Sequence, residues 1–438
     1  MENRTMKTVI IGGGPAGYVG AIRASKLGMS VTLVEKGELG GTCLNRGCVP
    51  TKALLQAASV YSAVTKEAAE WGIGVEGASV DTAKLYEKKN GIVEQLRKGI
   101  KFLMDTNKIE VISGTAMVLP NMQVLIKESG VTIDADKILV CTGSVAARLP
   151  IPGIEYALTS DDVLSAPVEA KKLAIIGGGV IGVELALFFA KMGCEVTIYE
   201  YLNALVAMMD TDISKQLLMQ LKRLGVKVQL QAAVKEIRKV EAGFEVDALI
   251  KEKPATASFD KVIACTGRKP YLGEVFAAGV TLNDDIKLAG DAAGGIQLAH
   301  YASAEAVNII EEWAGRKPHY NMNVVPQCIY TAPEAASVGV REQDCKEPVK
   351  IGMYRINGNP KALITGENSG FVKTIFSEAT GALIGAHIVA PHATDIIGEL
   401  AVAVANGLTQ AQIASVIHPH PTSCESILES IDYEDPII

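Results

Sequence analysis

The sequence predicts an α/β protein with two Rossmann-like dinucleotide-binding domains followed by a C-terminal α+β domain. A strand, a glycine-rich turn and a helix occur near the N-terminus, at Gly12, and again 165 positions later, at Gly177. The 438 residues are too many for a single hydrophobic core. From about Asn321 the chain alternates strands and turns, then shows helical patterns, and has no nucleotide motif.

The first glycine-rich turn follows a β-branched strand, Thr8–Ile11. Gly12 makes the turn, Gly14 lets a pyrophosphate approach the backbone, and Gly17 allows close packing of the helix. The next strand ends at Glu35, which is placed to accept hydrogen bonds from a ribose. Strand, helix and acid in this order indicate a dinucleotide-binding fingerprint.

The second copy has its glycines at Gly177, Gly179 and Gly182, and its second strand ends at Glu200. No Arg or Lys occurs from Tyr201 to Ser214 to neutralise a 2′-phosphate. The sequence therefore predicts NAD rather than NADP at this site.

A shorter repeat closes each unit, at Asp136–Gly143 and at Asp260–Gly267. Each is predicted to be a buried strand that brings a glycine turn to the bound nucleotide. Cys141 and Cys265 lie at the ends of these strands and are predicted core residues.

Cys43 and Cys48 lie close together in the sequence GGTCLNRGCVPTK, residues 40–52. Residues five apart in a regular helix are too distant for the ~4.4–6.8 Å Cα separation of a disulfide, so the backbone is expected to bend at Cys43. A helix N-terminus would favour the thiolate of Cys48. The pair predicts reversible disulfide chemistry. Two buried structural thiols, or half of a metal site, are the alternatives.

A second reactive stretch is HPHPTSCE, residues 418–425. His420 lies between two prolines, and Glu425 follows five residues later to orient its ring. This is a suitable acid–base pair for thiols near neutral pH. A solvated or purely structural loop histidine is the alternative.

These two stretches resemble the signatures GGTCxNxGCxPxK and HxHPTxxE of the pyridine nucleotide–disulfide oxidoreductase family. Within it, the chain is most similar to the dihydrolipoamide dehydrogenases, over nearly its whole length. The resemblance implies FAD in the first site and NAD in the second. The implied reaction oxidises protein-bound dihydrolipoamide to lipoamide and reduces NAD+ to NADH. A homodimer is also implied, with His420 of one chain facing Cys43 of the other.

The resemblance assigns residues to each role. The catalytic set comprises a redox disulfide, a base with its carboxylate, and an ion pair beside the flavin: Cys43 and Cys48, His420 and Glu425, Lys52 and Glu184. The FAD-binding residues are Gly12, Gly14, Pro15, Ala16, Gly17, Glu35, Lys36, Gly41, Thr42, Lys52, Ala116, Thr142, Gly143, Ser144, Asp291, Gln297, Leu298, Ala299 and His300. The NAD-binding residues are Gly177, Gly178, Gly179, Val180, Ile181, Gly182, Glu184, Glu200, Val234 and Gly267. No metal site is predicted.

The implied domains are residues 1–147 and 269–320 for FAD, 148–268 for NAD, and 321–438 for the dimer interface. The chain departs from the resembled family before Asp291, where Asn283–Leu288 is shorter by about one hairpin. Asp344–Lys350 also looks trimmed.

Composition restricts partners and location. A net charge of −7 and a pI near 5.6 argue against nucleic acid and anionic membranes. Six of the eight cysteines are scattered, which fits a reducing cytoplasm better than a secreted scaffold. A strand and a glycine turn follow the first few residues of the sequence almost at once, so no leader is expected. Glycines and Glu184 interrupt the apolar stretch Leu173–Ala190, which argues against a membrane span.

The partner that the family resemblance implies is a lipoyl-bearing protein of a 2-oxo acid dehydrogenase or glycine cleavage complex.

Several other functions are open to the same sequence. A glutathione-type reductase should carry basic residues after the second fingerprint's acid, and a mercuric reductase should carry a C-terminal cysteine pair; neither feature occurs. Another disulfide reductase, an NADH oxidase or diaphorase, and a largely structural subunit of a larger assembly stay as alternatives.

Overall fold

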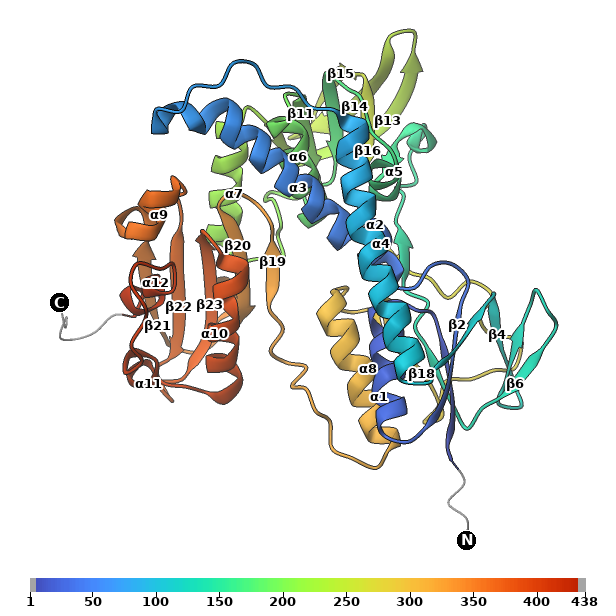
Figure 1. Cartoon of the computed structure of the whole chain (residues 1–438). Helices are drawn as coiled ribbons and strands as arrows, with labels where there is room; N and C mark the ends of the chain where they lie inside the picture. Colours follow the sequence, from blue (N-terminus) through green and yellow to red (C-terminus); the bar gives the residue numbers. More distant parts are fainter. Residues whose placement is uncertain (1–4, 432–438) are drawn as a thin grey trace.

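The computed structural model describes residues 5–431. It contains two units built on parallel sheets and a C-terminal unit built on an antiparallel sheet (Figure 1). The start of the chain, residues 1–4, and its last residues, 432–438, lie outside this description. The expectations about a leader and about a C-terminal cysteine pair fall partly on those residues.

The first unit is a five-stranded parallel sheet in the order β18-β7-β1-β2-β3. Its strands are β1 (Lys7–Ile11), β2 (Ser30–Glu35), β3 (Glu110–Ser113), β7 (Lys137–Val140) and β18 (Ile286–Leu288). Helices α1 (Pro15–Lys26) and α8 (Ala299–Trp313) cover one face, where Ile10 is buried. An antiparallel sheet of β4 (Ala116–Leu119), β5 (Gln123–Ile126) and β6 (Thr132–Asp134) covers the other, where Val9 and Ile11 are buried. Burial on both faces explains the continuous apolar run of β1.

The second unit repeats this plan in the order β12-β11-β10-β16-β9. Its strands are β9 (Leu158–Thr159), β10 (Lys172–Ile176), β11 (Glu195–Glu200), β12 (Lys227–Leu230) and β16 (Lys261–Ala264). Its helices are α5 (Ser160–Ser165), α6 (Val180–Lys191) and α7 (Thr211–Arg223). A meander of β13 (Ala232–Val240), β14 (Gly243–Ile250) and β15 (Lys253–Phe259) covers the face opposite α6. The ends of the two units meet where β8 (Ser144–Ala146) pairs with β17 (Arg268–Pro270).

The two cysteines lie on two successive helices rather than on one bent helix. Cys43 is within α2 (Gly41–Arg46), and Cys48 is the first residue of α3 (Cys48–Ser62). The backbone breaks between them at Gly47, with φ −143° and ψ −114°. The expected bend at Cys43 is therefore wrong in position, because the break falls at the glycine. The predicted long helical region continues from α3 through Ala63–Glu67 and Ala68–Trp71, but residues 72–81 are not helical and separate it from α4 (Thr82–Thr106).

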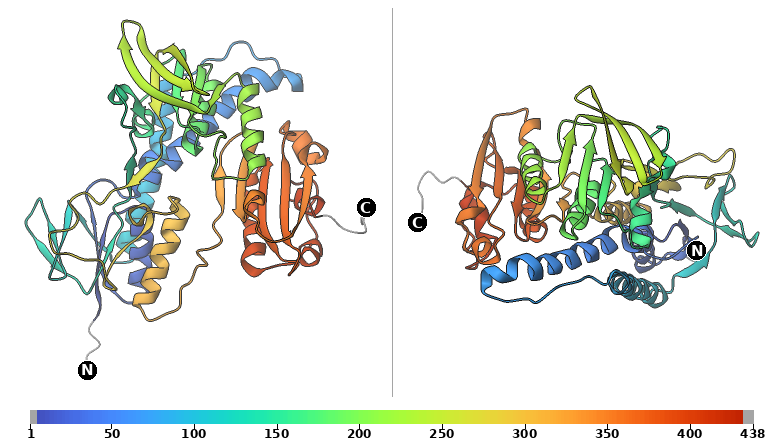
Figure 2. Two further views of the ribbon diagram at one scale, coloured as in Figure 1. Left: turned by 180° about the vertical axis from the view of Figure 1, so that it is seen from behind. Right: turned by 90° about the horizontal axis from the view of Figure 1, so that it is seen from above.

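The C-terminal unit is an antiparallel sheet in the order β19-β20-β23-β22-β21. Its strands are β19 (Gln327–Ile329), β20 (Glu334–Gly339), β21 (Val349–Arg355), β22 (Phe371–Ser377) and β23 (Leu383–Ala390). Its helices are α9 (Pro360–Thr365), α10 (Ala393–Asn406), α11 (Gln410–Ala414) and α12 (Glu425–Glu429). Figure 2 shows α7 between the second parallel sheet and this C-terminal sheet. The predicted fold class is confirmed.

The shortened segment before Asp291 is closed by a tight turn. The side chain of Asn283 accepts hydrogen bonds from the backbone of Asp285 and Ile286, at 2.8 and 3.0 Å. β18 then pairs in parallel with β7, and Ala289 N–H donates to Val140 O at 3.0 Å. Asp291 therefore follows directly from the edge of the first sheet.

No helix among residues 5–431 combines the length and the apolar character needed to cross a bilayer. Within the same residues, His, Cys, Asp and Glu side chains form no group of three or more arranged to hold a metal ion.

Candidate active site

The two glycine-rich turns have nearly the same backbone. Gly12 and Gly177 both have a positive φ, +103° and +105°, which favours glycine. A Cβ at Gly17 would lie 1.7 Å from Gly12 O, and one at Gly182 would lie 2.0 Å from Gly177 O. Neither helix start has a side-chain cap, so its amides are available to a phosphate. Both turns are thus suited to a pyrophosphate.

Each turn is followed by an acidic strand end. Glu35 accepts hydrogen bonds from Gly13 N–H at 2.6 Å and Gly37 N–H at 2.7 Å. Glu200 accepts the equivalent bonds from Gly178 and Leu202, at 2.6 and 2.7 Å. Both carboxylates are fixed at the position expected for ribose recognition.

One cavity of about 1520 Å³ joins the two turns and the cysteines. The predicted FAD residues that line it are Gly12, Gly14, Pro15, Ala16, Glu35, Lys36, Gly41, Thr42, Lys52, Ala116, Thr142, Gly143, Ser144, Asp291, Gln297, Leu298, Ala299 and His300. The predicted NAD residues that line it are Gly179, Val180, Ile181, Glu184 and Gly267. Six predicted residues do not line this cavity: Gly17, Gly177, Gly178, Gly182, Glu200 and Val234, the last of which is buried in β13.

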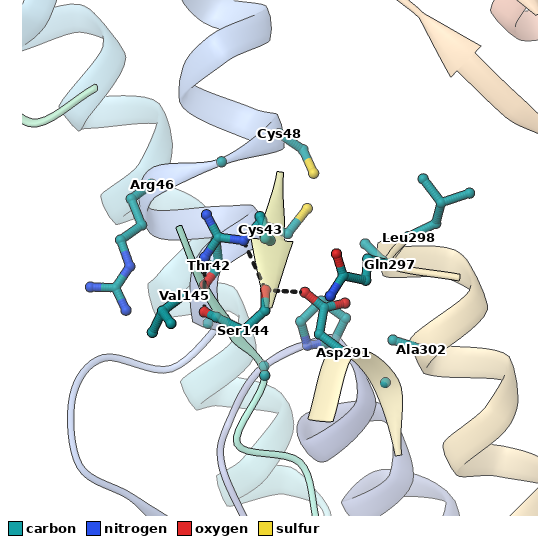
Figure 3. Close-up of a pocket in the computed structure, with 18 of the residues that line it drawn as sticks. Thr42, Cys43, Arg46, Cys48, Ser144, Val145, Asp291, Gln297, Leu298 and Ala302 are labelled. Carbon is teal, nitrogen blue, oxygen red and sulfur yellow. Dashed lines mark hydrogen bonds between the residues drawn. The ribbon is translucent and has the colours of Figure 1, made fainter. Parts of the chain in front are cut away.

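The cavity reaches both phosphate-binding turns, because Gly12 and Gly14 line it at the first turn and Gly179 lines it at the second. Helix α8 begins at its wall, and no side chain caps the start of this helix. The positive end of that helix favours a ligand that becomes anionic. Asp291 offers a carboxylate to the same space (Figure 3).

Cys43 and Cys48 present free thiols to the same space (Figure 3). The hydrogen bond from Cys43, with help from the Lys52 ammonium, outweighs burial and Glu184 and lowers the pKa of Cys48 to about 7. The same hydrogen bond and burial raise the pKa of Cys43. Cys48 is thus the thiolate of the pair, and Cys43 is the thiol.

Lys52 is held beside Cys48 by groups from three segments. Its ammonium lies 2.9 and 2.8 Å from the carboxylate oxygens of Glu184, which is buried on α6. The Tyr330 ring lies beneath the same ammonium, 4.5 Å from its centroid. Tyr330 N–H also donates to Glu184 at 3.1 Å. The predicted ion pair is present, and an aromatic ring completes it.

Asp291 is positioned by a chain of hydrogen bonds that the sequence did not reveal. Ser144 donates to Asp291 (Figure 3), and Arg268 Nε donates to Ser144 Oγ at 2.8 Å. Arg268 also donates to Ser144 O at 2.8 Å. The arginine of the second unit therefore orients groups of the first.

His420 and Glu425 form the predicted pair, with Nδ1 2.8 Å from the carboxylate. Burial raises the pKa of Glu425, but the Thr422 N–H and His420 outweigh it and leave that pKa below its usual value. His420 is 68% exposed and lines neither cavity of its own chain. The His418 side chain is 4% exposed, and its Nε2 lies 2.8 Å from the Glu399 carboxylate. One chain alone does not bring His420 to Cys43.

A smaller cavity of about 370 Å³ lies on the other side of Cys43. It is bounded by α1, α4 and α8, and its apolar residues include Leu44, Val49, Leu96 and Ile100. None of the described residues that line it is Lys, Arg, Asp or Glu. Cys43 thus lies between a nucleotide cavity and a mostly apolar outer one.

Sequence reasoning missed Tyr330, Arg268 and Met208 as parts of the site. Arg268 follows the second closing repeat, in GRKP, which could have marked it as lying beside a nucleotide. Tyr330 and Met208, which also line the large cavity, carry no local signal, because each reaches the site through tertiary packing.

Comparisons with known proteins agree with this site. Residues 6–306 match the family model described as pyridine nucleotide-disulphide oxidoreductase, and residues 325–431 match its dimerisation domain. Two dihydrolipoyl dehydrogenases of Bacillus subtilis (strain 168) are 35% and 37% identical, over 96% and 97% of this chain and 96% and 98% of theirs. The dihydrolipoyl dehydrogenase of Chlamydia trachomatis serovar D is 36% identical, over 98% of this chain and 96% of its own.

Among solved structures, the HOCl-induced flavoprotein disulfide reductase RclA from Escherichia coli is similar. Its TM-score is 0.85 at 26% identity, covering 97% of this chain and 99% of that one. Together these matches show an NAD-dependent flavin disulfide oxidoreductase with FAD and NAD(H) as cofactors, and the dimerisation domain supports a homodimer. The chain belongs to the pyridine nucleotide–disulfide oxidoreductase family.

Proposed function

We propose that this enzyme oxidises protein-bound dihydrolipoamide to lipoamide and reduces NAD+ to NADH. The observation that carries the proposal is the mostly apolar outer cavity beside Cys43, whose described lining contains no Lys, Arg, Asp or Glu. Its apolar walls suit an aliphatic dithiol better than glutathione disulfide, whose charged groups would lose water there without a partner. The dihydrolipoyl dehydrogenases among the relatives support the same substrate.

The chain's own residues would perform the dithiol exchange. The partner subunit's His420 would take a proton from one substrate thiol, and the thiolate would attack Sγ of Cys43 in a Cys43–Cys48 disulfide. Cys48 leaves as a thiolate, which suits its pKa of about 7. The second substrate thiol then attacks the mixed disulfide, its proton goes to Cys43, and cyclic lipoamide is released. When bound, FAD accepts the electron pair of the dithiol and NAD+ takes up the hydride.

The residues that would hold the cofactors follow the two repeats. The part of the chain up to residue 147, together with residues 269–320, would bind FAD through Gly12–Gly17, Glu35 and Asp291. Residues 148–268 would bind NAD+ through Gly177–Gly182 and Glu200. Lys52 and Glu184 would form the ion pair between the two cofactors, and the cation would favour an anionic reduced flavin.

From residue 321 onward, the chain would form the dimer interface and supply His420 to the other subunit. Apolar side chains next to the histidine motif support this: Val402, Val416 and Ile417 are 61%, 55% and 95% exposed. The substrate arm would come from a lipoyl-bearing protein of a 2-oxo acid dehydrogenase or glycine cleavage complex. The scattered cysteines favour the cytoplasm as the location.

The substrate assignment can be tested at the outer cavity. We expect the flavin-loaded enzyme to form NADH from dihydrolipoamide and NAD+, and to reduce glutathione disulfide with NADH far more slowly. Leu96→Arg places a cation at the cavity and should raise the KM for dihydrolipoamide about 10-fold, without changing flavin reduction by NADH. Leu103→Arg is the matched control, since Leu96 and Leu103 lie on α4 and are 46% and 41% exposed, but Leu103 does not line the cavity.

Equal use of dihydrolipoamide by wild type and Leu96→Arg, or faster turnover of glutathione disulfide, would contradict the proposal. The likeness to RclA, a flavoprotein disulfide reductase, would then favour reduction of another disulfide by NADH. A Cys43→Ser variant that keeps the physiological rate would instead indicate an NADH oxidase or diaphorase, in which the thiols are not needed.

A further inference from the structure

The loop after β11, residues 201–210, forms one side of the second nucleotide site. Val206 N–H donates to Gly178 O at 2.9 Å, and Leu205 is buried against Gly178, where a Cβ would lie 2.5 Å from the leucine side chain. Met208 and Met209 continue the loop along the wall of the large cavity. The shape of this loop therefore decides the shape of the site.

This loop contains a strained residue. Val206 has φ +42°, which a β-branched side chain rarely adopts. Such a conformation persists only where surrounding contacts hold it. The contacts that hold the end of the loop come from the C-terminal unit. Arg341 and Gln343, which make two of them, each lie 134 positions along the chain from the loop residue that they contact.

Residues 341–343 bind the end of this loop directly. Arg341 donates to Ala207 O at 3.0 Å, and the Gln343 side chain donates to Met209 O at 3.1 Å. Glu342 N–H donates to the Asp210 carboxylate at 3.2 Å. Three successive residues of the dimerisation domain thus fix residues 207–210.

A buried cation completes the contact. Lys373, in the middle of β22, is 1% exposed, and its ammonium lies 2.8 Å from Asp210, 2.6 Å from Asp212 and 2.7 Å from Glu342. The Asp210 side chain is fully buried. It caps the start of α7 by accepting a hydrogen bond from Asp212 N–H at 2.9 Å. The His387 ring lies 3.8 Å from the same carboxylate. Figure 1 and Figure 2 both place α7 against this C-terminal sheet.

We infer that Lys373, Arg341 and Gln343 are positioning residues for the nicotinamide nucleotide: through Asp210 and residues 207–209 the dimerisation domain holds the 201–210 loop in the shape that binds NAD+. The affinity for NAD+ then depends on Arg341, Gln343 and Lys373, although none of these three residues lines the large cavity. This inference rests on NAD+ binding at the second turn and is independent of which dithiol the enzyme oxidises.

The test measures the Kd of NAD+ by titration of the oxidised, flavin-loaded homodimer. The double variant Arg341→Met with Gln343→Ala removes both side-chain hydrogen bonds to the loop at half-exposed or exposed positions. We expect its Kd for NAD+ to rise about 10-fold, while flavin content and flavin reduction by dithiol stay unchanged. Lys373→Met leaves three carboxylates without their shared cation and should raise the Kd further.

Ser369→Ala is the matched control. Ser369 accepts hydrogen bonds from Gln216 at 2.8 Å and from Arg223 at 3.0 Å, so it joins the same α7 to the same domain away from the loop. We expect this variant to bind NAD+ like the wild type. The inference fails if the double variant binds NAD+ with unchanged Kd, or if Ser369→Ala weakens binding as much. If Lys373→Met does not fold, the double variant and its control decide the question.

Discussion

The two nucleotide units have the same turn but different surroundings. In the first, Gly40 N–H donates to Gly13 O at 2.8 Å, and Leu39 lies 2.8 Å from a Cβ placed at Gly13. In the second, Val206 and Leu205 make the equivalent contacts with Gly178, at 2.9 and 2.5 Å. The repeat therefore extends beyond the fingerprint to the loop that closes over it.

After this point the units diverge. In the first, the chain runs directly into α2, and a Cβ at Gly41 would lie 2.6 Å from the Gly14 Cα. In the second, a Cβ at Gly179 would have nothing within 4 Å, and the loop is held by the dimerisation domain. The first site is thus covered by α2, the helix that carries Cys43, which suits a cofactor retained through turnover. The second is open, which suits a nucleotide that exchanges.

The largest effect should come from filling the covered turn. Gly41→Ala brings a Cβ onto Gly14 and leaves an alanine at φ +59°, so we expect loss of most bound FAD and hence of activity. Gly179→Ala has room in the protein and should keep its FAD, with only NAD+ binding weakened, about 10-fold. The flavin-to-protein absorbance ratio of the purified variants checks this. Equal FAD loss in both would remove the distinction between covered and open sites.

The next effect should separate the two halves of the reaction. His420→Gln removes the proposed base, so reduction of the flavin by dihydrolipoamide should slow by roughly 10²–10⁴-fold. Reduction of the flavin by NADH, which uses the second unit, should not change. Stopped-flow measurement of each half-reaction tests this, and an equal slowing of both would assign His420 a structural role. His392→Gln, at an exposed histidine of the same domain, is the control.

A smaller effect is expected where the two units meet, at Lys52. The lysine helps to lower the pKa of Cys48, so Lys52→Met should raise that pKa above its value of about 7. Because the thiolate predominates above its pKa, alkylation of Cys48 in the reduced enzyme should reach half its maximum rate near pH 7 in the wild type and at higher pH in the variant. Lys98→Met, at a side chain that is 76% exposed, should leave the profile unchanged. A profile that does not move would show that Lys52 does not favour the thiolate.

The smallest effect should come from the ring beneath Lys52. Tyr330→Leu removes a cation–π contact worth about 0.5–1 kcal/mol, so we expect a few-fold change in the rate of Cys48 alkylation at pH 7. Tyr330→Phe keeps the ring and the backbone N–H that donates to Glu184, and should match the wild type. If Tyr330→Phe changes the alkylation rate as much as Tyr330→Leu does, the hydroxyl rather than the ring carries the effect.

The sequence revealed what depends on local spacing. Gly12, Gly14 and Gly17 must occupy fixed positions in a strand–turn–helix unit, and Glu35 must end the following strand, so their geometry could be predicted. The break between the cysteines was predicted, but its position at Gly47 was not, because both residue 43 and residue 47 were compatible with the spacing.

Contacts between distant segments were not visible in the sequence. Arg268 reaches Ser144 across 124 positions, and Lys373 reaches Asp210 across 163. No local pattern distinguishes such a buried lysine from a surface one. The shortened segment before Asp291 shows the same limit, because its closure depends on pairing between β18 and β7 rather than on the length of the loop.

The most direct test of the proposed reaction is an anaerobic reaction of the flavin-loaded enzyme, first with dihydrolipoamide alone and then with NAD+. We expect long-wavelength charge-transfer absorption between the Cys48 thiolate and the flavin after the first addition, and NADH after the second, with both signals lost in Cys48→Ser. An enzyme whose flavin stays oxidised in dihydrolipoamide but is reduced by NADH would contradict it, because the dithiol would then not deliver electrons through Cys43 and Cys48.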